Sequence, residues 1–345
     1  MALWRSGGAM SFWRIGSAML LCAFGAAAGP AQADERPLLS LPLACEPHKT
    51  CFIQNYVDDD AGPGVKDFAC GGATYDGHKG VDFRLISAEA TKADVPVLAS
   101  ADGTVKAVRD GVADIFARNN TSNDYKGREC GNGVVVDHGG GWETQYCHMK
   151  QGSVTATVGQ AIKRGEKLGS VGFSGFADFA HVHLSVRHDD KVIDPFLPDA
   201  IDGACQKDAK SNGMWRPEVA AAFRYKAGEV IATGFAGAPP DMNALEVDHT
   251  KVEPLTPSSA ALIFYGRMMN LTAGDRVRVV IDGPGGNLIE QLSQPLERNK
   301  ATLFPYGGKK RKAELWPAGR YEGRVEIVRE GAVVAASTSA IDLKP

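Results

Sequence analysis

Several motifs that would assign a function directly are missing from this sequence. It contains no HExxH zinc-protease motif, no GxSxG nucleophile motif and no glycine-rich phosphate-binding loop. It also contains no CxxC pair, so neither a redox enzyme nor a zinc ribbon is supported. The formal net charge is -3, which provides no basic field. Nucleic acid is therefore not expected as a partner.

The composition indicates a globular protein of about two domains. The chain has 345 residues, of which 44% are hydrophobic and 23% charged. It also has 40 glycines and 18 prolines, which favour many turns and short strands over long helices. We therefore expect a mainly β fold.

The N-terminal segment, residues 1–33, predicts a secretory signal peptide. Two arginines come first, an apolar run covers residues 15–29, and Ala31-Gln32-Ala33 is a small-x-small cleavage signal. The run is shorter than the roughly 20 residues that span a membrane, which argues against the alternative of an anchor. We expect an exported protein with no stable membrane span after cleavage. No wall-sorting tail or wall-binding repeat is recognisable, so the expected compartment is the periplasm of a Gram-negative bacterium.

The cysteines agree with export. The chain has seven, and removal of the signal peptide removes Cys22 and leaves an even number. An even count in an exported chain indicates disulfides, although many pairings are possible. Spacing favours Cys45 with Cys51. A pair between Cys130 and Cys147 would face across a hairpin that turns near residues 139–141, and Cys70 with Cys205 then follows by elimination.

Patterning divides the mature chain into four parts. Residues 34–75 predict an irregular, disulfide-tied lead-in, in which Asp58-Asp59-Asp60 is interpreted as a solvated acidic turn. Residues 76–204 contain short alternating strands between glycines and a long polar loop at 110–130. The strand-like runs are 81–85, 97–108 around Asp102-Gly103, 133–148 as a hairpin, and 181–187.

The second half predicts a linker and a further β domain. Residues 205–235 predict a linker with a short helix that begins at Pro217 and extends to Lys226. Residues 236–345 predict a small immunoglobulin-like β-sandwich of unknown role. Its strand-like runs are 261–267, 276–281, 321–328 and 332–337.

The histidines carry the chemistry. Along the run from His181 to Arg187, alternation places three apolar residues on one face and His181 and His183 on the other, roughly 6.6 Å apart. His78 and Asp82 are four residues apart, with Gly77 and Gly80 allowing a close approach. His148 closes the second strand of the predicted hairpin. Imidazole nitrogens and a carboxylate oxygen are normal zinc donors, and three protein ligands leave a position for water.

At these residues the chain resembles the lysostaphin/LytM family of zinc metallopeptidases. The motifs are His78-Lys79-Gly80-Val81-Asp82, Tyr146-Cys147-His148 and His181-Val182-His183, with Asp102–Val105 and Gly172–Gly175 as further similarities. The resemblance covers about residues 75–200. It implies an antiparallel, glycine-rich sheet or open barrel as the catalytic fold.

The resemblance also implies the roles of the residues. His78, Asp82 and His183 would bind Zn²⁺, and His148 and His181 would be the catalytic pair that assists a zinc-activated water molecule. The expected reaction is hydrolysis of peptide cross-links or stem peptides of bacterial peptidoglycan. Ala180 stands where the family usually has proline, and Ser185 where an acidic residue is common.

An alternative function is a non-catalytic LytM-like envelope module that binds and activates another cell-wall hydrolase. Modules of that kind lose metal ligands, whereas this chain keeps all of the relevant residues, so the sequence favours the enzyme. The C-terminal domain could contact an envelope protein. Which peptide bond is cut, and which of His148 and His181 has which role, stay open at this level.

Overall fold

The computed structural model describes residues 35–119, 125–200, 204–207, 212–312 and 314–345. The predicted signal peptide and its cleavage site lie outside these ranges, as do residues 120–124 of the expected polar loop. Among the described residues, no helix combines the length and the apolar character needed to cross a membrane.

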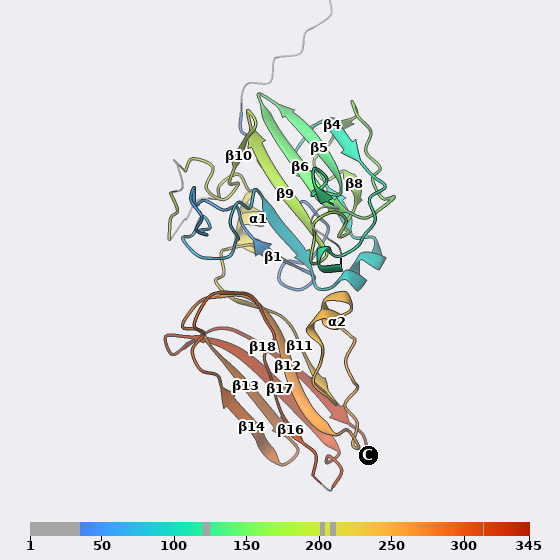
Figure 1. Cartoon of the computed structure of the whole chain (residues 1–345), viewed down its shortest axis with the longest axis vertical. Coiled ribbons are helices and arrows are strands. Elements are labelled where there is room, and N and C mark those ends of the chain that lie inside the picture. The colour runs from blue at the N-terminus through green and yellow to red at the C-terminus, as the bar shows by residue number, and fades with distance from the viewer. Residues whose placement is uncertain (1–34, 120–124, 201–203, 208–211, 313) are drawn as a thin grey trace, which may run out of the picture. The chain divides into compact units, whose positions relative to one another are not determined.

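An eight-stranded antiparallel sheet, called the large sheet below, holds the predicted site residues (Figure 1). Its strands lie in the order β1 (Cys51–Asn55), β2 (Val81–Leu85), β9 (His181–His188), β6 (Trp142–Met149), β5 (Asn132–Gly139), β4 (Gly103–Arg109) and β7 (Ala161–Ile162), and β10 (Lys191–Ile193) also pairs with β9. β5 and β6 form the predicted hairpin. Because β1 and β7 do not pair with each other, the sheet stays open.

The alternating sequence of β9 determines which face carries the polar residues. Val182, Leu184 and Val186 are at most 1% exposed and belong to the main hydrophobic core. Each such side chain contributes on the order of 1.5–3 kcal/mol when buried. A one-residue slip in register would move all three to the other face, so this burial fixes the register. It thereby fixes the positions of His181 and His183 on the opposite face.

A second, two-stranded sheet consists of β3 (Pro96–Leu98) and β8 (Lys167–Ser170). Short 3₁₀ helices at Ala88–Ala93 and Ala117–Asn119 lie in the connections. The two strands predicted around Asp102-Gly103 are β3 and β4, which belong to different sheets.

The lead-in is more ordered than its sequence suggested. It contributes β1, whose residues are all buried and which pairs with β2. Burial on both faces removes the alternation that identifies half-buried strands, which explains why β1 was not predicted. The disulfides Cys45–Cys51, Cys70–Cys205 and Cys130–Cys147 match the predicted pairings.

The prediction of a solvated turn at Asp58–Asp60 is wrong. Asp58 accepts hydrogen bonds from the Lys66 and Gly77 backbone N–H groups at 3.0 and 2.9 Å. Oδ2 of Asp59 is buried. Backbone donors at positions 66 and 77 hold the Asp58 carboxylate, and local sequence does not reveal such donors.

The predicted linker helix is α1 (Pro217–Ala222), with the proline at its first position. It ends four residues before the expected Lys226. After β11 (Glu229–Ala236), the helix α2 (Met242–Val247) begins at Asp241, whose side chain accepts a hydrogen bond from the Ala244 N–H. Neither β11 nor α2 was predicted from the sequence.

Two four-stranded antiparallel sheets form the C-terminal sandwich and share one hydrophobic core. One contains β11, β12 (Ala261–Leu271), β15 (Lys300–Leu303) and β16 (Tyr306–Lys310), and the other contains β14 (Gly286–Leu292), β13 (Arg276–Gly283), β17 (Gly319–Arg329) and β18 (Ala332–Leu343). The predicted mainly β fold with antiparallel sheets is confirmed.

The large sheet and the C-terminal sandwich belong to one compact unit, residues 34–345. Hydrogen bonds connect them directly. The Asn270 side chain donates to the Gln54 carbonyl at 2.8 Å, and the Arg267 guanidinium donates to the Ile86 carbonyl at 2.7 Å.

Candidate metal centre

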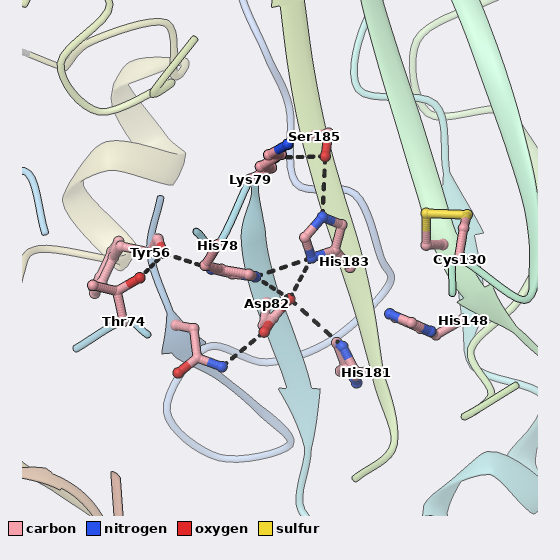
Figure 2. Close-up of polar contacts among 12 residues, drawn as sticks. Tyr56, Thr74, His78, Lys79, Asp82, Cys130, His148, His181, His183 and Ser185 are labelled. Carbon is pink, nitrogen blue, oxygen red and sulfur yellow. Dashed lines mark hydrogen bonds and ion pairs between the residues drawn. A yellow bond between two sulfur atoms is a disulfide. The ribbon is translucent and has the colours of Figure 1, made fainter. Parts of the chain in front are cut away.

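Three predicted ligands meet on the polar face of the large sheet (Figure 2). Asp82 on β2 pairs directly with His183 on β9, and His78 lies in the loop that enters β2. His78 Nε2 is 3.2 Å from Asp82 Oδ1 and 3.1 Å from His183 Nδ1. His183 Nδ1 is 2.8 Å from Asp82 Oδ1. The three donor atoms therefore converge on one point.

Hydrogen bonds at the far side of each ring decide where the imidazole protons are. His78 Nδ1 is 2.6 Å from the Tyr56 carbonyl oxygen, which can only accept, so this nitrogen carries the proton. Ser185 donates its hydroxyl proton to the Lys79 carbonyl at 2.6 Å and accepts from His183 Nε2 at 3.0 Å. In their neutral forms, His78 Nε2 and His183 Nδ1 therefore present lone pairs to the centre.

This set fits a zinc ion. Two imidazole nitrogens and a carboxylate oxygen at such distances must share either protons or a cation, because their lone pairs would otherwise repel one another. Tetrahedral zinc with ligands at about 2.0–2.2 Å holds them roughly 3.3–3.5 Å apart. The three atoms would need to separate by only roughly half an ångström. The donor chemistry and the spacing both suit zinc.

Close packing supports this geometry. Gly80 lies against His183, and a Cβ there would be 2.6 Å from both His183 Nε2 and the Leu184 carbonyl. A residue other than glycine would displace the His183 ring. The predicted close approach at Gly80 is thus present in the structure.

Asp82 is 2% exposed and is held in its charged form. Burial alone would raise the pKa of its carboxyl group, but the neighbouring His78 and His181 hold that pKa well below its usual range. Its second oxygen, Oδ2, accepts a hydrogen bond from Asn55 Nδ2 at 2.8 Å. The hydrogen bond from Asn55 therefore orients the Asp82 carboxylate so that Oδ1 faces the histidines.

His148 and His181 lie beside this set, with their ring centroids 4.5 Å apart. Their Nδ1 atoms donate to the Ser174 and Phe179 carbonyls at 2.7 and 2.9 Å. Burial lowers the pKa of His148 well below its ordinary value, and the adjacent His181 lowers it further. Burial also lowers the pKa of His181. Both rings are therefore neutral at neutral pH, with an unprotonated Nε2 available to accept a proton.

The backbone of His148 has a left-handed conformation, with φ of 61°. Such a conformation costs a residue with a side chain on the order of 1–3 kcal/mol and persists only where surrounding contacts enforce it. Two contacts do so here. The His148 N–H donates to the Cys130 carbonyl at 2.8 Å, and Cys130 forms a disulfide with Cys147, the residue before His148.

The other four histidines lie outside this cluster. His138 hydrogen bonds with the Asp102 carbonyl and Thr144, and His48 with Glu229. His188 stacks on Trp142, and His249 contacts Ser87. The five predicted site residues are thus the ones that the fold brings together.

Sequence reasoning missed the residues that orient the five. Asn55, Tyr56 and Ser174 come from distant loops and strands and gave no local signal. Ser185 did give one, because it lies two residues after His183 in an alternating strand and must share its face. It was noted as a departure from the family pattern, and in this structure it holds the His183 ring.

Comparison with known proteins places this centre in a family. Residues 76–195 match the model described as Peptidase family M23. The chain is 29% identical over 136 residues to an uncharacterized metalloprotease of Haemophilus influenzae, which covers 39% of this chain and 24% of the relative. It is 28% identical over 122 residues to the peptidoglycan DD-endopeptidase ShyB of Vibrio cholerae, which covers 35% and 23% respectively. The chain spans about a quarter of the length of these relatives.

Among solved structures, the catalytic domain of the antimicrobial peptidase lysostaphin from Staphylococcus simulans is 20% identical, with a TM-score of 0.26. That match covers 41% of this chain and 85% of the lysostaphin chain.

The family match and the geometry coincide in position. All five clustered residues, from His78 to His183, lie inside the matched range. The resemblance predicted from the motifs is confirmed, and residues 76–195 of this chain form a LytM-type domain of Peptidase family M23.

Proposed function

We propose that this chain is an exported, zinc-dependent endopeptidase that hydrolyses peptide bonds of bacterial peptidoglycan. One observation carries the proposal. Three donor atoms of His78, Asp82 and His183 converge at 2.8–3.2 Å, beside the imidazoles of His148 and His181, whose pKa values burial lowers. The match to Peptidase family M23 and the similarity to a peptidoglycan endopeptidase support the substrate class.

Zinc bound by the three residues would polarise the scissile carbonyl and lower the pKa of a bound water molecule toward neutrality. The protein residues then manage the protons. His148 or His181 accepts the water proton at Nε2 and returns it to the nitrogen of the departing amine. Their Nδ1 protons are donated to backbone carbonyls, so neither ring can donate from Nε2 until it has taken up a proton. Stabilisation of the oxyanion by an imidazole therefore follows proton uptake.

The same proposal assigns a role to each part of the chain. Residues 76–204, with β1 of the lead-in, would be the catalytic part, and the C-terminal sandwich would begin at β11, inside the predicted linker 205–235. Three disulfides and the signal-like N-terminus support a periplasmic location, since disulfides persist in oxidising compartments.

Digestion of purified peptidoglycan sacculi tests the function. The mature chain with zinc should release soluble peptide-containing fragments, which chromatography and mass spectrometry identify together with the bond that is cut. Asp82→Ala and His181→Ala should release none above background. An inactive wild-type protein that contains zinc, or variants as active as the wild type, would overturn the proposal.

A further inference from the structure

Arg84 is a buried cation next to the candidate active site. It lies two residues after Asp82 on β2, and it pairs across the sheet with His181 on β9. Its exposed fraction is 0%. The guanidinium donates to Gln54 Oε1 at 2.8 Å and to Glu246 Oε1 at 2.6 Å. Glu246 belongs to α2, so a residue of the C-terminal half contacts a strand of the catalytic sheet.

A second buried arginine shares the same carboxylate. Arg267 on β12 is 4% exposed and donates to Glu246 Oε2 at 2.6 Å. In the described part of the chain, Glu246 carries the only carboxylate within ion-pair distance of Arg84 or Arg267. Two guanidinium groups thus face one carboxylate, which leaves one positive charge in excess. Buried charges are strongly destabilising unless they are paired, so this arrangement is complementary to an additional anion.

These residues line a cavity of about 270 Å³, called the junction cavity below. Its walls also include Arg118, Asp178, Phe179 and Thr302, so both halves of the chain contribute. Asp178 accepts a hydrogen bond from the Arg118 backbone N–H at 3.1 Å, and three arginines against two carboxylates still leave one positive charge in excess. Arg118 is exposed, and its guanidinium lies over the Phe116 ring at 4.0 Å. Each guanidinium has five N–H groups, and Arg267 uses two of them in the hydrogen bonds to Glu246 and Ile86. Donors for an incoming carboxylate are therefore present.

Phe179 connects the junction cavity to the active site. Its ring lies 4.4 Å from the His181 ring by centroids, and the Arg84 guanidinium lies 4.9 Å from the Phe179 centroid. The Phe179 carbonyl accepts the His181 Nδ1 proton. Phe179 thus contacts both an arginine of the cavity and a proposed catalytic imidazole.

We propose that the junction cavity is a substrate subsite, in which Arg84, Arg267 and Arg118 bind a carboxylate of the peptide whose neighbouring bond is cut. This inference rests on the proposed function, and it gives the C-terminal sandwich a role in substrate binding. Carboxylate recognition by arginine is strong because the hydrogen bonds are charge-assisted. Peptides that carry a free carboxylate beside the scissile bond are the favoured class, and peptides with that group amidated are disfavoured.

Binding measurements test the subsite without requiring hydrolysis. The probes are a fluorescein-labelled Ala-Glu-Lys-Ala-Ala peptide and its analogue with Gln for Glu and an amidated C-terminus. Fluorescence anisotropy with the full-length mature chain gives both Kd values, and mass spectrometry verifies that the peptides stay intact. The wild type should bind the carboxylate peptide about tenfold more tightly than the amidated one.

A variant that fills the subsite with its own anion provides the sharpest comparison. Thr302 is exposed and lines the cavity, so Thr302→Glu places a fixed carboxylate beside the arginines. Its preference for the carboxylate peptide should fall below about twofold, and its melting temperature should equal or exceed that of the wild type. Thr338→Glu, which makes the same change at an exposed site on β18, should keep the wild-type preference.

Equal affinity of the wild type for the two peptides would overturn the subsite, and so would an undiminished preference in Thr302→Glu. The two proposals fail separately. Digestion of sacculi without any binding preference would support the proposed enzymatic function and contradict the proposed subsite. A binding preference without digestion would support an anion-binding cavity and contradict the proposed enzymatic function.

Discussion

Two buried aspartate environments in the large-sheet region behave in opposite ways. Asp82 in the metal centre and Asp194 after β10 are 2% and 6% exposed. Burial raises the pKa of Asp194 well above its ordinary value, and the charge of Asp59 raises it further. The same burial acts on Asp82, but the neighbouring histidines hold its pKa well below the usual range. Partners, and not burial, decide which aspartate is charged.

The difference shows what each region can do. An aspartate that stays charged among histidine nitrogens is suited to hold a cation. Asp59 and Asp194 form instead an acidic pair, and each has an Oδ2 atom that is buried without a hydrogen-bond partner among the described residues. Because ionised carboxylates only accept hydrogen bonds, such a pair is stable when it is protonated.

The largest effect is expected from loss of a proton acceptor in the metal centre. His148→Ala should lower the rate of peptidoglycan hydrolysis by about 10²–10⁴-fold, since general base catalysis contributes on that order. Zinc content should stay at the wild-type level because His148 is not in the converging set. Rates on soluble sacculus fragments and elemental analysis give the two readouts. His188→Gln is the control, because His188 stacks on Trp142 outside the cluster. A His148→Ala protein with wild-type rates would contradict the assignment.

A smaller effect is expected from Ser185. Ser185→Ala removes the hydrogen-bond acceptor that fixes the His183 ring, so zinc affinity should fall by roughly 10–100-fold. Competition with a chelator of known zinc affinity measures the change. Ser153→Ala, a serine change away from the cluster, is the matched control. Unchanged zinc affinity in Ser185→Ala would mean that the His183 ring is oriented by packing alone.

The disulfide next to His148 should contribute to both stability and activity. Replacing Cys130 and Cys147 with serine should lower the free energy of unfolding by about 2–4 kcal/mol. It should also lower the hydrolysis rate several-fold with zinc retained, because the left-handed backbone of His148 would lose one of its constraints. Urea unfolding and sacculus digestion measure these effects. The double replacement of Cys45 and Cys51 controls for loss of a disulfide elsewhere, and equal activity of the two double variants would count against the constraint.

The smallest effect is expected at the acidic pair. Burial, together with the charges of the nearby Asp58 and Asp67, raises the pKa of Asp59 to about 6. The folded state therefore binds this proton more tightly than the unfolded state. The resulting stability is complete below pH 3.8 and is lost as the pH rises through about 6.

Asp59→Asn should flatten this part of the pH dependence and stabilise the protein at pH 7.5. Urea unfolding at intervals from pH 4.5 to 7.5 measures the slope, and Asp60→Asn supplies the same change in net charge as a control. A variant that keeps the full wild-type slope would show that the acidic pair does not titrate in this range.

The sequence predicted which residues cluster at the candidate metal centre because their pattern is local. Alternation along β9 places His181 and His183 on one face, and the spacing of His78 and Asp82 brings both to one end of β2. The hairpin, the disulfides and the longer strands of the sandwich were also predictable from alternation and spacing. These features depend on residues close together in the chain or on a simple period, except for Cys70–Cys205, which followed by elimination.

What the sequence did not reveal depends on contacts between distant segments. Tyr56 orients His78 and Ser174 orients His148 through backbone carbonyls, which carry no sequence signal. The interpretation of Asp58–Asp60 as solvated failed for the same reason. The junction cavity likewise requires Arg84 and Arg267, from two halves of the chain, to meet at Glu246. No local pattern predicts such a meeting.

Zinc stoichiometry in Asp82→Asn and Asp194→Asn tests the central claim most directly. Both substitutions replace a buried aspartate with its uncharged isostere, so only the role of the charge differs. Elemental analysis of the wild type and of Asp194→Asn should give one zinc ion per chain, because a protonated carboxyl group is well replaced by an amide. Asp82→Asn should retain none after dialysis. Equal zinc content in the two variants, or a wild type that binds no zinc, would contradict the account.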